Sequence, residues 1–137
     1  MNKLAVLATR GSINSLVSLF TLTMAAAVSE FQVRILFRDE AVLKLTRKQV
    51  GLMNLSDAYR GMEQEVAERI RTYALGDLQK LIQELKSRGD VKLYACTSSM
   101  AICGVTAEDL IPEIDEPRGL TSFLLEEMSE AEMVLTF

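Results

Sequence analysis

Two cysteines are the residues whose type and placement in this chain could support a reaction. Cys96 stands in "VKLYACTSSMAICG", residues 91–104, between an apolar stretch and a predicted helix. Free backbone N–H groups at a helix start favour an anion and lower the pKa of a thiol. We therefore expect a reactive thiolate at Cys96, with Thr97, Ser98 and Ser99 binding its anionic adducts. The alternative, a buried cysteine acting as a small hydrophobic residue, remains open.

Cys103 is the second thiol of the segment. It follows Cys96 by seven residues, so a helix would separate the two by about 10 Å along its axis, and a disulfide requires Cα atoms within about 7 Å. The spacing is not that of a C-x-x-C redox pair. We expect Cys103 to be a secondary thiol in the core.

Several kinds of site are excluded by composition. The chain has no histidine, so a Cys–His nucleophile pair and a histidine-containing metal site are both excluded. Two cysteines cannot form a four-thiolate zinc site, and we expect neither a metal nor an organic cofactor. "TRGSINS", residues 9–15, lacks the spacing of a phosphate-binding loop. It places Arg10 and Gly11 after the first predicted strand, where they could bind an anionic substrate or, alternatively, belong to a solvated loop.

The apolar pattern predicts the elements that position these residues. Strands are expected at 3–8, 31–37, 91–95, around Glu113–Ile114 and at 133–137. Helices are expected at 13–28, 65–74, 77–89, 98–103 and 120–131, with a helical turn at 106–111. Residues 45–62 are expected to form an excursion over the sheet edge.

Strands that alternate with helices indicate β-α-β units. We predict a single α/β domain over residues 1–137, with three α/β/α layers around a mostly parallel sheet of about five strands. Ligands of such sheets bind beyond the carboxyl ends of the strands, where Cys96 and Arg10 are both expected.

Charge and hydropathy limit the possible partners. The net charge of −4 gives no basic surface for nucleic acid. Residues 13–28 would span about 24 Å as a helix, less than the hydrocarbon core of a membrane. Two cysteines and no disulfide pattern favour the cytoplasm.

The predicted helix over residues 13–28 is apolar around most of its circumference. Its apolar residues are Ile13, Leu16, Val17, Leu19, Phe20, Leu22 and Met24. One sheet face cannot easily cover all of them, so we predict a homo-oligomer.

The order of elements and the stretch "LYACTSSMAICGVTAEDLI", residues 93–111, resemble the DsrE/DsrF-like family of small sulfur-handling proteins. The tail "GLTSFLLEEMSEAEMVLTF" is similar to that family's closing helix and strand. The resemblance implies an α/β/α fold, an oligomer, and a sulfur-carrying cysteine at Cys96. The partners it implies are a TusA-type sulfur carrier or a rhodanese-like donor.

The predicted function is that of a sulfurtransferase or sulfur carrier, in which the Cys96 thiolate attacks sulfane sulfur and passes it to a partner thiol. Two alternatives remain. One is a nucleotide- or anion-binding module with an incidental thiol, and the other is a thiol peroxidase.

Overall fold

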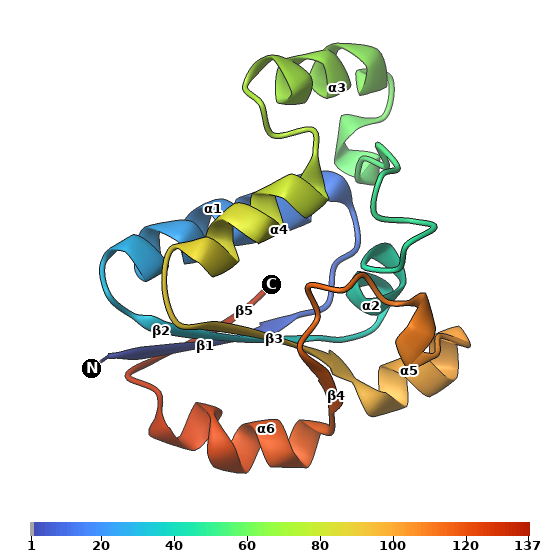
Figure 1. Ribbon diagram of the computed structural model, residues 1–137. Helices are drawn as coiled ribbons and strands as arrows, with labels where there is room; N and C mark the ends of the chain where they lie inside the picture. The colour runs from blue at the N-terminus through green and yellow to red at the C-terminus, as the bar shows by residue number, and fades with distance from the viewer. Residues whose placement is uncertain (1) are drawn as a thin grey trace.

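One parallel sheet organises the chain. The computed structural model describes residues 2–137, and its strands are β1 (Lys3–Ala8), β2 (Gln32–Phe37), β3 (Val91–Cys96), β4 (Glu116–Arg118) and β5 (Met133–Thr136). All neighbouring strands are parallel, in the order β4-β3-β2-β1-β5 (Figure 1). This confirms the predicted fold class.

Helices cover both faces of this sheet. α1 (Ile13–Val28) and α4 (Leu78–Ser87) lie side by side over one face, and α6 (Leu120–Glu126) covers the other (Figure 1). Ser12 caps α1 by accepting a hydrogen bond from the Ser15 amide, and Asp77 caps α4 through the Lys80 amide. The larger apolar core lies under α1 and α4, and a smaller cluster lies under α6.

Two short helices stand at the carboxyl ends of the central strands. α2 (Glu40–Lys44) follows β2, and α5 (Thr97–Cys103) follows β3 directly. α5 ends at Gly104, whose φ of 66° is left-handed and favours glycine. The 3-10 turn η2 (Ala107–Asp109) comes next, with a capping box between Thr106 and Asp109.

The expected strand around Glu113–Ile114 is wrong. The fourth strand comes three residues later, as β4, and Ile114 instead packs into the larger core. Asp115 contacts β3 twice, since its amide donates to the Leu93 carbonyl and its carboxylate accepts from the Leu93 amide, both at 2.8 Å. β4 begins at the next residue.

The helix expected over 120–131 is shorter than predicted. α6 ends at Glu126, and a 3-10 turn, η3 (Met128–Glu130), follows. The break falls at Glu127, whose side chain is buried and turned toward the sheet.

Residues 45–62 form the expected excursion, which contains the 3-10 turn η1 (Asp57–Tyr59) and ends at the start of the next helix. Asn54 and Ser56 bind the β1–α1 turn, since Ile13 donates to the Asn54 carbonyl and Ser56 donates to Asn14. α3 (Glu63–Thr72) then projects from the body of the molecule (Figure 1). Ala67 is its buried residue.

The apolar circumference of α1 is largely covered within the chain. Ile13, Leu16, Leu19 and Phe20 are buried, while Leu22 remains 40% exposed. α4 covers much of the remaining apolar surface of α1, a contact that was not predicted from the sequence. Among residues 2–137, no helix is long and apolar enough to cross a bilayer.

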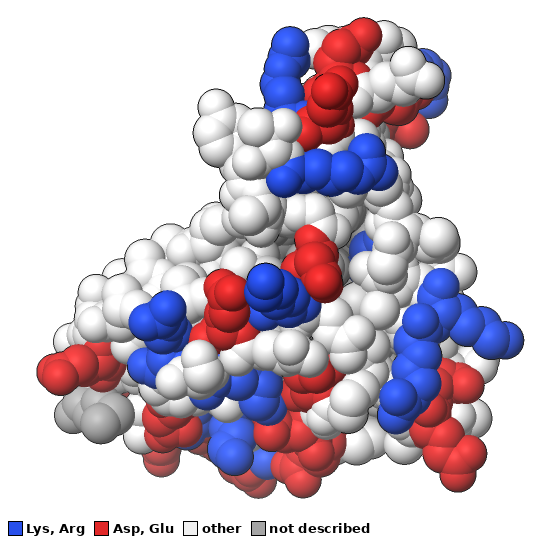
Figure 2. All heavy atoms as spheres, turned by 45° about the horizontal axis from the view of Figure 1, so that its top comes forward, with Lys and Arg blue, Asp and Glu red and all other residues white. Residues whose placement is uncertain are grey.

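The charged side chains are intermixed on the surface. On the face that Figure 2 shows, Lys and Arg alternate with Asp and Glu over the body of the molecule. The acidic excess of the sequence therefore does not form a continuous patch on this face.

Candidate functional site

Cys96 is the last residue of β3 and lies at the carboxyl edge of the sheet. Its side chain belongs to the small cluster under α6, together with Leu36, Tyr94 and Phe123. It is fully buried. This burial is what a cysteine acting as a small hydrophobic residue would show, although the sequence predicts a reactive thiolate at this position.

The surroundings of this thiol favour its ionised form. Burial raises the pKa of Cys96, but hydrogen bonds to the thiolate outweigh burial and lower the pKa to about 7. The donors are the Ser98 hydroxyl, whose Oγ lies 3.3 Å from Sγ, and the backbone amides of Ser98 and Ser99. The thiolate is therefore more favoured near neutral pH than in an ordinary cysteine.

Arg38 is the cationic residue of this site, and the sequence analysis did not identify it. The guanidinium of Arg38 also lowers the pKa of Cys96. Phe37 pairs with Ala95 in the parallel register of β2 and β3, so the next residue of each strand, Arg38 and Cys96, follows at the same edge. Arg38 Nε is buried without a hydrogen-bond partner among the described residues.

Arg10 lies elsewhere. β2 separates β1 from β3 in the sheet, and Arg10 lines a polar cavity of about 480 Å³ at the start of α1. The structure therefore does not bring Arg10 and Cys96 to one pocket.

Gly11 has a packing role in the structure. A Cβ at this position would lie 2.6 Å from the Glu40 carbonyl oxygen, which excludes any larger residue without movement. Its N–H donates to the Glu40 carboxylate at 3.2 Å.

The three polar residues after Cys96 are placed differently from one another. Ser98 contacts the thiol, whereas the Ser99 hydroxyl is buried and accepts a 2.9 Å hydrogen bond from the Asp39 amide. Thr97 is exposed, with its Oγ1 close to Gly119 at the start of α6. Cys103 is partly buried, and its thiol donates to the Asp39 carbonyl at 3.7 Å.

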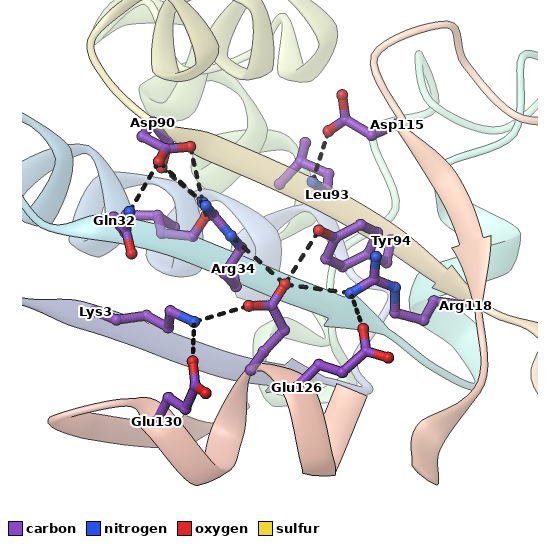
Figure 3. Close-up of polar contacts among 12 residues, drawn as sticks. Lys3, Gln32, Arg34, Asp90, Leu93, Tyr94, Asp115, Arg118, Glu126 and Glu130 are labelled. Carbon is purple, nitrogen blue, oxygen red and sulfur yellow. Dashed lines mark hydrogen bonds and ion pairs between the residues drawn. The ribbon is translucent and has the colours of Figure 1, made fainter. Parts of the chain in front are cut away.

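A charged cluster lies on the sheet face covered by α6 (Figure 3), the face that also buries Cys96. Its centre is the buried Glu127 carboxylate, which contacts Lys3 at 2.9 Å, Arg34 at 3.6 Å and Arg118 at 3.2 Å. Arg118 pairs with Cys96 in the register of β3 and β4, but its guanidinium lies over the Tyr94 ring, 4.0 Å from the centroid. The guanidinium of Arg118 thus belongs to the charged cluster, and Arg38 is the cation beside the Cys96 thiol.

The described residues contain no group of three or more His, Cys, Asp or Glu side chains that could hold a metal ion. The chemistry available at the site is that of a thiolate with hydrogen-bond donors and one guanidinium.

Comparison with solved structures supports the fold. The structure of a protein of unknown function from Methanobacterium thermoautotrophicum is similar over 100% of both chains, with 13% sequence identity and a TM-score of 0.64. No curated protein gives a significant match. The sequence model of the DsrE/DsrF-like family matches residues 2–137. The chain therefore belongs to the DsrE/DsrF-like family.

Proposed function

We propose that this protein is a sulfur-relay protein that holds sulfane sulfur on Cys96 and passes it to a partner thiol. The observation that carries the proposal is the placement of Cys96 at the end of β3 with the Ser98 hydroxyl 3.3 Å from Sγ, which helps to lower the pKa of the thiol, in a chain of this family. The thiolate is the nucleophile that sulfur transfer requires.

The transfer chemistry needs no cofactor. With thiosulfate, the Cys96 thiolate attacks the outer sulfur, the S–S bond of the donor breaks, and sulfite leaves with the electron pair. With tetrathionate, the same attack leaves a thiosulfonate on Cys96 and releases thiosulfate. A partner thiolate then attacks the outer sulfur of the Cys96 persulfide and restores the Cys96 thiolate.

Arg38 and the Ser98 amide would bind the anionic adduct. Persulfide and thiosulfonate are both negative, and the unpartnered Nε of Arg38 is a donor for such an anion. Because Cys96 is fully buried, a donor reaches it after local movement of the residues that cover it, such as Phe123 of α6. The natural donor would then be a rhodanese-like protein or a TusA-type carrier.

Intact-mass analysis after incubation with thiosulfate, tetrathionate or polysulfide tests this function. We expect added sulfur on Cys96 that a reductant removes. Cys96→Ser should lose the adduct, whereas the matched control Cys103→Ser should keep it. Equal loading of Cys96→Ser and the wild type would refute the proposal.

One observation favours a second function, that of an anion-binding module. The cavity of about 480 Å³ beside Arg10 is lined mostly by polar side chains, among them Ser12, Asn14 and Ser56 and also the carboxylates of Glu40 and Asp57. Thermal stabilisation by nucleotides, lost in Arg10→Ala and accompanied by no sulfur on Cys96, would favour it. A sulfenic acid at Cys96 with rapid peroxide turnover would instead indicate a thiol peroxidase.

A further inference from the structure

The turn after β2 has an unusual backbone conformation at Asp39. Its φ of 50° and ψ of −131° lie in a region that residues with a Cβ rarely adopt. Such a conformation persists only where the surroundings hold it, and it occurs often at functional sites.

α5 contacts both backbone polar groups of Asp39. The Asp39 N–H donates to Ser99 Oγ at 2.9 Å, and the Asp39 carbonyl accepts from Cys103 Sγ at 3.7 Å. Ser99 and Cys103 are four residues apart and so lie on one face of the helix. The Ser99 contact is the stronger one, since its Oγ is buried and the sulfur donor is weak.

The position of this turn matters because Arg38 immediately precedes it. The Arg38 amide donates to the Ala8 carbonyl at 2.8 Å, which fixes one side of the residue in the sheet. Asp39 fixes the other side and sets the direction in which the chain leaves β2. The two contacts together hold the backbone that carries the guanidinium beside Cys96.

We propose that Ser99 is a positioning residue that holds Asp39 in its strained conformation and thereby holds Arg38 beside Cys96. This role deepens the proposed function, on which it rests for the identity of the reacting group. Ser99 thus acts through its hydroxyl on Asp39, in addition to the hydrogen bond from its backbone amide to the thiolate.

The strain and the hydrogen bond are of similar size in proteins generally, so removal of the hydroxyl should release the turn. Arg38 would then leave the thiol, and the pKa of Cys96 would rise. A hydroxyl that only satisfied the Asp39 amide would have no such effect on the thiol.

The test is the pH profile of iodoacetamide alkylation at Cys96, followed by peptide mass spectrometry. Ser99→Ala should move the midpoint upward by about 1 pH unit, as expected for the loss of one charge-assisted hydrogen bond. Ser99→Thr, which keeps a hydroxyl, should retain the wild-type midpoint. In an Arg38→Ala background, Ser99→Ala should add no further shift, because the two residues act through one contact.

Asp39→Gly provides a rescue. Glycine adopts the conformation of Asp39 without strain, so Asp39→Gly should return the midpoint of Ser99→Ala toward the wild-type value. An unchanged midpoint in Ser99→Ala, or an equal shift in the Arg38→Ala background, would overturn the inference. Loss of folding in Ser99→Ala that Asp39→Gly does not restore would also overturn it, since Ser99 would then act on the core.

Alkylation does not depend on sulfur transfer, so the two proposals fail separately. A protein that shows these shifts but gains no sulfur would refute the sulfur function alone. A protein that loads sulfur on Cys96 while Ser99→Ala keeps the wild-type profile would refute only the role of Ser99.

Discussion

The Tyr94 hydroxyl donates a 3.2 Å hydrogen bond to the buried carboxylate of Glu127. This contact joins the end of α6 to the strand that ends at Cys96, on the face where the thiol lies. Burial, together with the neighbouring Glu127 charge, raises the pKa of Tyr94 to about 12, so the phenol stays protonated and remains a donor.

Removal of the Glu127 carboxylate should destabilise the fold. Glu127→Ala leaves the cations Lys3, Arg34 and Arg118 without their shared partner, and we expect a loss of about 3 kcal/mol in the free energy of unfolding. Urea denaturation measures it. The control is Glu126→Ala, which removes a 62% exposed carboxylate from Arg118 and should cost less than about 1 kcal/mol. Equal losses in the two variants would contradict the role of Glu127.

The reactivity of Cys96 should depend on pH with a midpoint near 7. Only the thiolate reacts, so the alkylation rate should rise as the pH increases through about 7 and level off above it. In urea the hydrogen bonds to the thiolate are lost, and the midpoint should move to about 8.5. Alkylation quenched at set times and followed by peptide mass spectrometry measures both profiles. A folded-state midpoint at or above the midpoint in urea would contradict the prediction.

The two arginines that follow strands should differ in their effect on sulfur loading. Arg38→Ala removes the guanidinium beside Cys96, and we expect loading from thiosulfate to slow about tenfold, as for the loss of one charge-assisted hydrogen bond. Arg10→Ala should leave the rate within about twofold, since Arg10 lines another cavity. The rate of mass increase measures both, and a larger effect of Arg10→Ala would argue against this site.

The protein should be an oligomer. Leu22, Ala25 and Val28 are spaced three residues apart on α1 and are all exposed within one chain. A contiguous exposed apolar stripe of this kind often marks a contact between subunits. Light scattering at micromolar concentration should give a multiple of the chain mass. Leu22→Arg should lower that mass, while Thr72→Arg, an exposed polar position on the projecting helix α3, should not. A monomeric wild type would contradict the prediction.

The sequence identified β1, β2, β3, β5 and the place of the thiol because these depend on local patterns. Continuous apolar runs form central parallel strands, and the cysteine stands where one such run meets a helix. The family resemblance rested on the same local stretch, and the match over residues 2–137 confirms it.

The arginine partner could not be chosen from the sequence because the choice depends on strand order. Arg10 and Arg38 each follow an apolar strand, and each is therefore expected at the same sheet edge. Only the order β3-β2-β1 shows that Arg38 is adjacent to Cys96 and that Arg10 is one strand further away. Taking the first charged residue after each predicted strand as a candidate would have identified both arginines.

The charged cluster around Glu127 could not be predicted from the sequence for a related reason. "EEMSEA" continues a helical pattern, so Glu127 reads as one more acidic residue on a solvated helix. Its partners Lys3, Arg34 and Arg118 come from three different strands. No local pattern relates these positions.

The projecting helix α3 has a consequence for how the chain could be divided. Tyr73, at the end of this helix, is 75% exposed, and such segments are where proteases cut. A cut there would leave β1 and β2 on one fragment and β3, β4 and β5 on the other, held together by the β2–β3 and β1–β5 ladders. Arg38 and Cys96 would then belong to different fragments. The protein is in this sense built from two complementary pieces, and its reactive centre exists only while they are assembled.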